Sequence, residues 1–229
     1  MNKPDQQLPP GVASALAVAE IPPSKLGPAR RARLSHSNRE LYFWILRRFA
    51  THGRPSSAET RAAAGQLGLE LERALATLAR EDLIHLGSDG EIAVAYPFSG
   101  RPTAHRVHLA SGHEIDAMCA IDALGIAPMF GEPIEVRSQD PLSREDVRVR
   151  LAPDGEGSWE PETAVVVAGV LDRCDESFRG CCPALNFFAS SESAERWLQE
   201  HPDVRGQVIS MPDAIAAGRA VFGNVFEER

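Results

Sequence analysis

The chain has 229 residues, of which 43% are hydrophobic and 24% are charged, and its formal net charge is -8 at pH 7. A chain of this length has enough residues for one large domain or two small ones with a buried core. The acidic balance argues against a general nucleic-acid binder and against a protein that docks on anionic lipids, because phosphate groups attract positive charge.

The first residues, MNKPDQQLPPGVASALAVAEIPP, contain a short apolar run that follows Pro, Asp and Gln. A signal peptide has a basic segment before its apolar one, and a membrane span needs about 20 apolar residues, so neither is indicated. We therefore expect a cytoplasmic protein with no membrane partner. Thiols stay reduced in that compartment, so the four cysteines are expected to be reactive, metal-binding or core residues rather than a disulfide framework.

Residues 1–36 are expected to form a flexible, Pro-rich and basic tail. Prolines recur through this stretch and interrupt any helix, and PARRARLSHS is a run of positive charge. That run could contact nucleic acid, but a solvated linker is the more common role of such a segment.

Residues 37–98 follow the pattern of a winged-helix module. We expect helices in NRELYFWILRRFATHG, AETRAAAGQLG and LELERALATLAREDL, and then two short strands around the Ser-Asp-Gly turn of LIHLGSDGEIAVAYPF. The third helix would be the one that reads DNA, yet residues 69–82 hold two arginines against four acids. A phosphate-facing helix is normally basic, so we interpret the module as a packing domain and nucleic acid as an unlikely partner.

Residues 99–229 combine short antiparallel strands with helices, which indicates an α+β core. Strand pairs are expected in HRVHLASGHEID and in EPIEVRSQDPLSREDVRVRL, and TAVVVAGVL is apolar enough to be a strand buried on both faces. A short helix is expected in CAIDALGIAPMFG, ending at Gly125 or just past it. SSESAERWLQEHP and PDAIAAGRAVFGNVF indicate two further helices, with the strand GQVISM between them.

Cys119 and Asp122 are three residues apart at the start of the expected helix. If both are helical, their side chains lie on one face, one turn apart. A thiol beside a carboxylic acid is chemically useful, because the thiolate binds or attacks while the acid gives or takes a proton. The fragment also fits a buried core cysteine followed by a solvated aspartate, which is the more common situation.

The stretch RGCCPALNFF places two cysteines side by side before a proline. Proline suits the first position of a helix or a tight turn, so Cys182 is expected near a helix N-terminus, where the positive end of the dipole lowers a thiol pKa. Adjacent side chains point apart, so one functional thiol with a neighbour is expected. A buried loop cysteine is the alternative.

Other common kinds of site are poorly supported. A zinc site needs four ligands, and the sequence lacks CxxC; Cys174 and Cys181 could combine with His105 or His113 only through the fold. His105 and His108 are interpreted as surface or core histidines. No glycine-rich phosphate loop, GxSxG or HExxH is present, which argues against the commoner hydrolases and nucleotide enzymes.

The chain contains short motifs in a fixed order: HRV, ID and CAID, then EPI, WEP and AVVV, then CC, FFAS, W, EH and GQVIS. This order resembles that of the organomercurial lyases, also called alkylmercury lyases. The resemblance runs from about residue 40 to the C-terminus. It implies an N-terminal winged-helix-like portion that packs on an α+β core and needs no DNA. It also implies three catalytic residues, Cys119, Asp122 and Cys182. Cys182 is preferred over Cys181 by its distance to the two phenylalanines, and a one-residue shift in the loop would exchange them.

The chemistry that the resemblance implies suits these residue types. Mercury(II) is a soft ion that prefers thiolates, so two cysteines from different segments can hold it. Cys119 is expected to attack, and Asp122 to carry a proton from a thiol to the departing carbanion. Cys182 is expected to complete the set that holds the product Hg(II). A donor acid needs a raised pKa and hence an apolar pocket; the expected walls are Phe187, Phe188, Met129 and Phe130.

The resemblance implies no organic cofactor and no metal before substrate arrives. Cytosolic thiols are expected to bring the organomercurial substrate and to help remove the product, with a mercuric reductase as downstream partner in a mercury-resistance, or detoxification, system. Two alternatives stay open. One is a soft-metal binding or sensing protein whose winged helix binds DNA, although a pure binder has no use for Asp122. The other is a structural α+β protein with incidental core cysteines.

Overall fold

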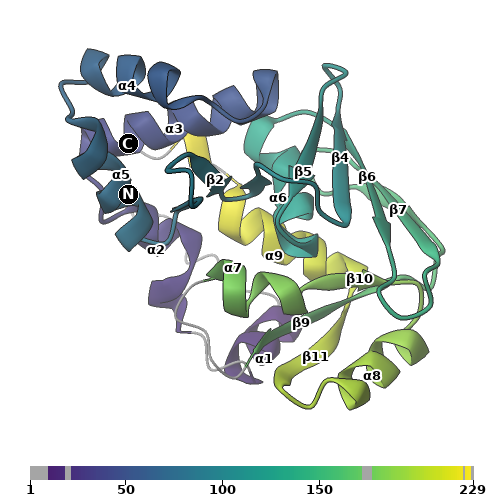
Figure 1. Cartoon of the computed structure of the whole chain (residues 1–229). Helices are drawn as coiled ribbons and strands as arrows, with labels where there is room; N and C mark the ends of the chain where they lie inside the picture. The colour runs from purple at the N-terminus through teal and green to yellow at the C-terminus, as the bar shows by residue number, and fades with distance from the viewer. Residues whose placement is uncertain (1–9, 19–21, 172–176, 224, 228–229) are drawn as a thin grey trace, which may run out of the picture.

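The computed structural model describes residues 10–18, 22–171, 177–223 and 225–227 (Figure 1). The helices are α1 (Pro10–Val18), η1 (Pro23–Lys25), α2 (Gly27–Arg31), α3 (His36–His52), α4 (Ser57–Gln66), α5 (Leu71–Arg80), α6 (Ala120–Phe130), α7 (Ser177–Gly180), η2 (Cys182–Ala184), α8 (Ser191–Glu200), α9 (Met211–Phe222) and η3 (Val225–Glu227). The strands are β1 (Ile84–Leu86), β2 (Ile92–Ala95), β3 (Phe98–Ser99), β4 (His105–Leu109), β5 (Glu114–Ala117), β6 (Ile134–Gln139), β7 (Asp146–Leu151), β8 (Gly157–Glu160), β9 (Val165–Leu171), β10 (Asn186–Phe188) and β11 (Val204–Ser210).

The stretch before α3 is folded against the rest of the chain. Pro10 is the first residue of α1, and a proline also lies in the first turn of α2, where proline costs no intrahelical hydrogen bond. Arg31 is fully buried and donates to the carbonyl of Val221 at 3.1 Å, and Leu34 belongs to the main core. The expectation of a flexible tail without helices is therefore wrong for residues 10–18 and 22–36; residues 1–9 and 19–21 lie outside the described residues.

The three helices of the expected winged-helix module are present as α3, α4 and α5. Ser35 caps α3 by accepting from a backbone N–H, and Ser56 forms a capping box with Glu59 at the start of α4. The apolar stripes of α3 and α5 face the core, as their spacing predicts. In Figure 1 the three helices lie together at one end of the molecule.

The expected hairpin of β1 and β2 is confirmed, and it continues into the core as one sheet. The strand order is β1-β2-β3-β5-β4-β6-β7-β8, with every neighbouring pair antiparallel. Val107 is paired with Val136, and Val136 with Val149, and all three are buried. Because side chains alternate between faces, this register leaves the arginines between the valines on the outer face. The helical module and the core therefore share one sheet.

A second sheet has the order β10-β9-β11, again antiparallel. β9 is its central strand and is apolar on both faces, as predicted from TAVVVAGVL. The helix α8, capped by Ser190 as its sequence predicts, packs Trp197 against Phe188 of this sheet. The α+β class expected from the sequence is confirmed.

The helix α6 is buried on nearly all sides and packs closely along α9, and in Figure 1 both helices lie in the middle of the molecule. The expectation that it ends near Gly125 is wrong: it continues through Pro128 to Phe130, and Gly131 then takes the left-handed conformation at φ 69°. Gly125 instead permits close contact with α9, because a Cβ atom there would collide with Phe222. Burial of the whole segment outweighs the local tendency of Gly and Pro to end a helix.

Replacing Gly218 in α9 by Ala is expected to destabilise the protein by about 1–3 kcal/mol, the usual cost of overpacking a core. A Cβ atom at this position would lie 2.7 Å from the backbone nitrogen of Gly125 and would push α6 and α9 apart. Denaturant unfolding measures the change. The matched control is Gly65→Ala in α4, where a Cβ atom meets nothing within 4 Å; it is expected to stabilise by about 0.4–1 kcal/mol. Equal effects of the two changes would contradict the close packing of α6 on α9.

Candidate active site

Cys119 lies where the sheet passes into α6. It follows β5 and Met118, and its extended backbone makes it the residue that caps α6. Its sulfur accepts from the backbone N–H of Asp122 at 3.4 Å. The expectation that Cys119 lies within the helix is therefore corrected: it precedes the helix, because a side chain that accepts from the first turn needs a non-helical backbone. Asp122 is in that first turn, where the helix dipole favours negative charge.

Cys182 comes from a separate segment, the short helices α7 and η2 that follow β9. Cys181 caps η2, Cys182 is its first residue, and Pro183 follows, so the turn expected from Cys-Cys-Pro is confirmed. The backbone N–H of Ala120 donates to the carbonyl of Leu185 at 2.9 Å. This bond fastens the end of the cysteine segment to the start of α6.

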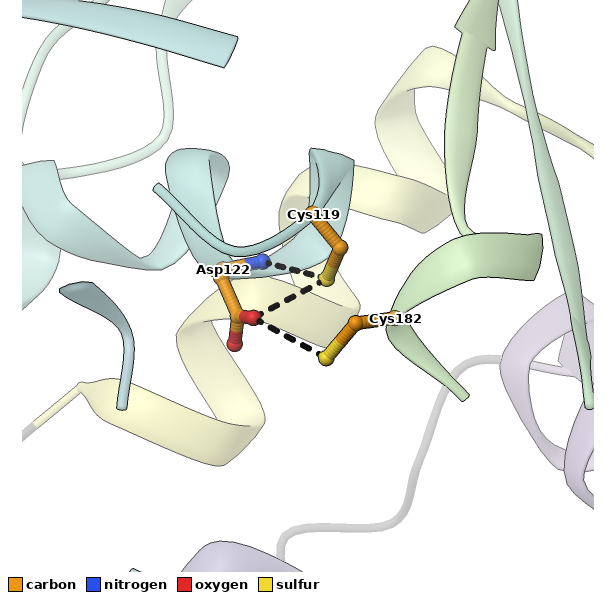
Figure 2. A group of neighbouring side chains, drawn as sticks. All are labelled: Cys119, Asp122 and Cys182. Atoms are coloured by element: carbon orange, nitrogen blue, oxygen red, sulfur yellow. Dashed lines mark hydrogen bonds between the residues drawn. The ribbon is translucent and has the colours of Figure 1, made fainter. Parts of the chain in front are cut away.

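The three residues meet in one buried group (Figure 2). The thiol of Cys119 donates to Oδ2 of Asp122 at 3.1 Å, and the thiol of Cys182 donates to the same oxygen at 3.8 Å. One ligand atom from each residue lies within 4.8 Å of the other two. Cys119 is 1% exposed, and Asp122 and Cys182 are each 6% exposed. Two thiols and a carboxyl group thus converge where water has little access.

The adjacent Cys181 does not join this group. Cys181 is half-buried, and of the two adjacent cysteines it is Cys182 whose sulfur lies near Asp122. Cys174 lies outside the described residues. Among the residues that the structure describes, the group of Cys119, Asp122 and Cys182 is the one set of His, Cys, Asp and Glu side chains with ligand atoms this close.

Burial controls the proton affinity of the group. It raises the pKa of Asp122 to about 7, although the hydrogen bonds from Cys119 and Cys182 act in the opposite direction. Burial also raises the pKa of Cys119 well above the usual thiol value, and Cys182 and the Asp122 charge add to this. The isolated acid is therefore poised to exchange a proton near neutral pH.

The expectation of a lowered pKa for Cys182 is wrong. Its hydrogen bond with Cys119 lowers the pKa, but burial and the charge of Asp122 together outweigh that bond and raise the pKa to about 11. A single 3-10 turn contributes too little dipole to reverse them. Both thiols are consequently protonated in the resting site at neutral pH.

The residues expected to form apolar walls around Asp122 belong to two different clusters. Met129 and Phe187 are buried in the core cluster that also holds Cys119 and Cys182, and Phe130 packs against that cluster. Phe188 lies in a second cluster with Val167, Ala194 and Trp197, so its expected place in the wall is wrong. Consecutive side chains of a strand point to opposite faces, which sends Phe187 and Phe188 to different clusters.

Three groups near the site were not predicted from the sequence. The charges of Asp82 and Arg30 both act on Asp122, the first raising its pKa and the second lowering it. The buried phenol of Tyr96 interacts electrostatically with Cys182, Asp82 and Asp122. All three residues come from the first half of the chain, and their proximity to the cysteines is a product of the fold.

The histidines considered for a zinc site are placed elsewhere. His105 is buried, with Nδ1 2.9 Å from the hydroxyl of Ser138, and burial lowers its pKa to about 4. His108 lies against Glu114 at the surface of the sheet, and His113 is exposed. The interpretation of His105 and His108 as core and surface histidines is confirmed.

Comparison with known proteins assigns the chain to a family. The sequence model of the alkylmercury lyase family matches residues 98–223, which include all three residues of the group. An alkylmercury lyase of Staphylococcus epidermidis is 30% identical over 188 residues, which is 81% of this chain and 84% of that protein. The chain belongs to the alkylmercury lyase family.

Other relatives agree with the alkylmercury lyase assignment. The alkylmercury lyase of Bacillus cereus is 34% identical over 127 residues, or 56% of each chain, so this match spans about half the length of that relative. The crystal structure of the mercury-bound form of MerB2 has a TM-score of 0.72 at 20% identity and covers 88% of this chain and 98% of its own. That likeness shows a shared fold. Among the described residues, no helix is both long and apolar enough to cross a membrane.

Replacing Asp122 by Asn is expected to lower the pKa of both buried thiols, because the carboxylate charge that opposes thiolate formation is gone. At a fixed pH below the thiol pKa values, alkylation of Cys119 and Cys182 by iodoacetamide should then be several-fold faster. The control is Asp116→Asn on β5, whose carboxylate pairs with Arg106 instead. Unchanged or slower alkylation in Asp122→Asn would contradict the electrostatic coupling of the group.

Proposed function

We propose that this member of the family is an organomercurial lyase, which cleaves the carbon–mercury bond by protonolysis to a hydrocarbon and Hg(II). The observation that carries the proposal is the single carboxylate oxygen of Asp122 that accepts from both Cys119 and Cys182. A mercury ion held by two thiolates would lie beside the acid that must protonate the departing carbon.

The first step is a thiol exchange. A substrate R–Hg–SR′, with the mercury carried by a small cytosolic thiol, gives its mercury to Cys119. The Cys119–mercury bond forms, the bond to SR′ breaks, and the proton of Cys119 leaves with R′SH. Thiolates bind soft mercury in preference to oxygen or nitrogen ligands, so the exchange needs no organic cofactor and no resident metal.

The second step is the protonolysis. Cys182 passes its proton to Asp122 and its thiolate binds the mercury, which pushes electron density toward the carbon. Asp122 then delivers the proton to that carbon, and the carbon–mercury bond breaks to release R–H. The product is Hg(II) held by Cys119 and Cys182 beside the regenerated carboxylate, so atoms and charge balance. A pKa of about 7 makes Asp122 a competent proton donor near neutral pH. Cys182, whose pKa is about 11, gives up its proton only as its sulfur binds the mercury.

Product release completes the cycle. Two molecules of an exogenous thiol are expected to exchange for the two cysteines and carry Hg(II) away, so turnover requires added thiol. A mercuric reductase is the class of enzyme that would consume the product.

The test is release of benzene from phenylmercury by the purified protein supplied with thiol. Cys119→Ala and Cys182→Ala are expected to abolish turnover, because each removes a mercury ligand. Asp122→Ala is expected to lower kcat by about 10²–10⁴-fold, the usual contribution of acid–base catalysis. Cys181→Ala is the matched control and should keep its activity, since Cys181 is outside the group.

Two other outcomes decide between alternatives. If Cys181→Ala is inactive and Cys182→Ala is active, the assignment of the second thiol is wrong. If the wild-type protein binds phenylmercury or Hg(II) stoichiometrically and releases no hydrocarbon, the protein is a soft-metal binder and not a lyase.

The pH dependence of kcat/KM should follow the ionisation of the Asp122 carboxyl group. Only the ionised carboxylate can accept the proton of Cys182, and its folded-state pKa is raised to about 7. Below that pH the rate should therefore fall about tenfold per pH unit, and above it the rate should level off. The measurement is the initial rate of benzene release at saturating thiol. A rate that rises as the pH falls below 7 would mean that Asp122 enters the reaction already protonated.

A further inference from the structure

The carboxylate of Asp82 joins three segments that are far apart in the sequence. Its Oδ2 lies 2.5 Å from Nη1 of Arg30 in α2 and accepts from the hydroxyl of Ser177 in α7 at 2.6 Å. Its Oδ1 lies 2.8 Å from Nε2 of His85 in β1. The side chains of Arg30, Asp82 and His85 are 15%, 14% and 10% exposed, so these bonds are largely shielded from water.

The backbone of Asp82 is in a conformation that normally favours glycine. Asp82 follows α5 with a φ of 52°. Its N–H donates to the carbonyl of Ala79 at 2.9 Å, and the N–H of Leu83 donates to that of Leu78 at 3.0 Å. This is the Schellman ending of a helix, in which the left-handed position is usually glycine because a Cβ atom is unfavourable there.

The preceding helix ends with the same turn and does use glycine. After α4, Gly68 has a φ of 69°, its N–H donates to the carbonyl of Gly65, and the N–H of Leu69 donates to that of Ala64. The chain therefore has glycine where only the turn is needed and aspartate where the side chain is bonded to other segments. A strained residue whose side chain is fully bonded indicates a role for that side chain.

The partner Ser177 leads directly to the second thiol. Its N–H also donates to Oδ2 of Asp82, at 3.2 Å, and its carbonyl accepts from the N–H of Cys181 at 2.9 Å. Phe178, the next residue, has its ring centroid 4.1 Å from that of His85. The first turn of α7 is thus fixed on the Asp82–His85 pair, five residues before Cys182.

Cys119 is held by other contacts. Met118 donates to the carbonyl of Pro97 at 3.0 Å, and Ala120 donates to that of Leu185, so the backbone on each side of Cys119 is fixed within the core. Cys119 itself also caps α6. None of these bonds involves Asp82. The Ala120–Leu185 bond is common to both thiols, whereas the contacts of Asp82 are made only with the Cys182 segment.

We propose that Asp82 is a positioning residue for the second thiol: together with Arg30 and His85 it holds the first turn of α7, and this places Cys182 over Asp122. The consequence for catalysis rests on the proposed lyase function, whereas the placement of Cys182 does not. Arg30, which lies in the basic run PARRARLSHS, thereby has a structural role as a partner of Asp82.

The experiment measures how fast iodoacetamide alkylates each thiol, in a Cys181→Ala background so that Cys182 is unambiguous in the tryptic peptide. In Asp82→Gly the turn keeps the residue it favours, so folding is retained while the carboxylate is lost. We expect alkylation of Cys182 to rise about tenfold or more through local opening, and that of Cys119 to stay within about twofold. Ser177→Ala keeps the Asp82 charge, which raises the pKa of Cys182, and removes the hydroxyl that donates to it; this variant should act in the same direction and so separates loss of the contact from loss of the charge.

The matched control is Glu81→Gln. Glu81 pairs with Arg33 at 2.6 Å and so joins the same two N-terminal segments through a bond that does not include α7. Both thiols should keep their wild-type rates in this variant. Equal acceleration of Cys119 and Cys182 in Asp82→Gly would show general loosening and would overturn the proposal, as would an unchanged rate for Cys182.

The phenylmercury assay separates the two hypotheses. If the wild type releases benzene, Asp82→Gly should lower kcat more than it raises KM, because Cys119 still receives the substrate while Cys182 is displaced. If the wild type releases no benzene but Cys182 alone is accelerated in Asp82→Gly, the positioning role stands and the proposed lyase function fails.

Discussion

A single buried carboxylate, that of Asp122, connects the two thiols, and the arrangement of the site depends on it. Isolated in an apolar interior, a carboxylate is strongly destabilised unless it is hydrogen-bonded or protonated. Here the available donors are the two thiols, that of Cys119 just after β5 and that of Cys182, which lies 60 residues after Asp122. The fold therefore has to bring the carboxylate and the two thiols together at high precision, because the thiols are weak donors and have to lie close to the oxygen to stabilise it.

The surrounding elements supply that precision by packing. α6 carries Asp122 and is enclosed between the sheets and α9, with glycine at the closest approach of the two helices. The interior of a protein resists small displacements because it is close-packed. The cysteine segment is fastened at its end to the backbone of Ala120, and at its beginning to Asp82. Cys119 and Asp122 thus lie in the close-packed part of the site, whereas the segment of Cys182 is supported by the helical module through Asp82.

Much of this fold could be predicted from the sequence, because its patterns are local. The alternating valines of β6 and β7, the serine caps and the apolar β9 all follow from periodicity and composition. The predictions failed where burial outweighed local preference. Gly125 and Pro128 lie inside a helix because the whole helix is enclosed, and Pro10 and Pro28 begin helices that pack on the body of the chain.

The candidate site was predictable in its residues and not in its surroundings. Cys119 and Asp122 are close in sequence, and resemblance to a family added Cys182, but a pattern of letters does not give the burial that sets their proton affinities. The role of Asp82 is harder still to predict from the sequence, since its partners come from α2, β1 and α7. The local indication of a special role was that Asp82 takes the left-handed position after α5, where the corresponding residue after α4 is Gly68.

The continuity of the larger sheet has a consequence for any attempt to divide the chain. The family match begins at Phe98, within β3. A fragment cut there would lose β2, which pairs with β3, and β1, which pairs with β2. The two-residue β3 would then be a weak edge, and the hydrogen-bonding groups of β5 beyond it would be open to pairing with another molecule. The strands β1 and β2 therefore cover the edge of β3 within the larger sheet, a structural task that requires no DNA.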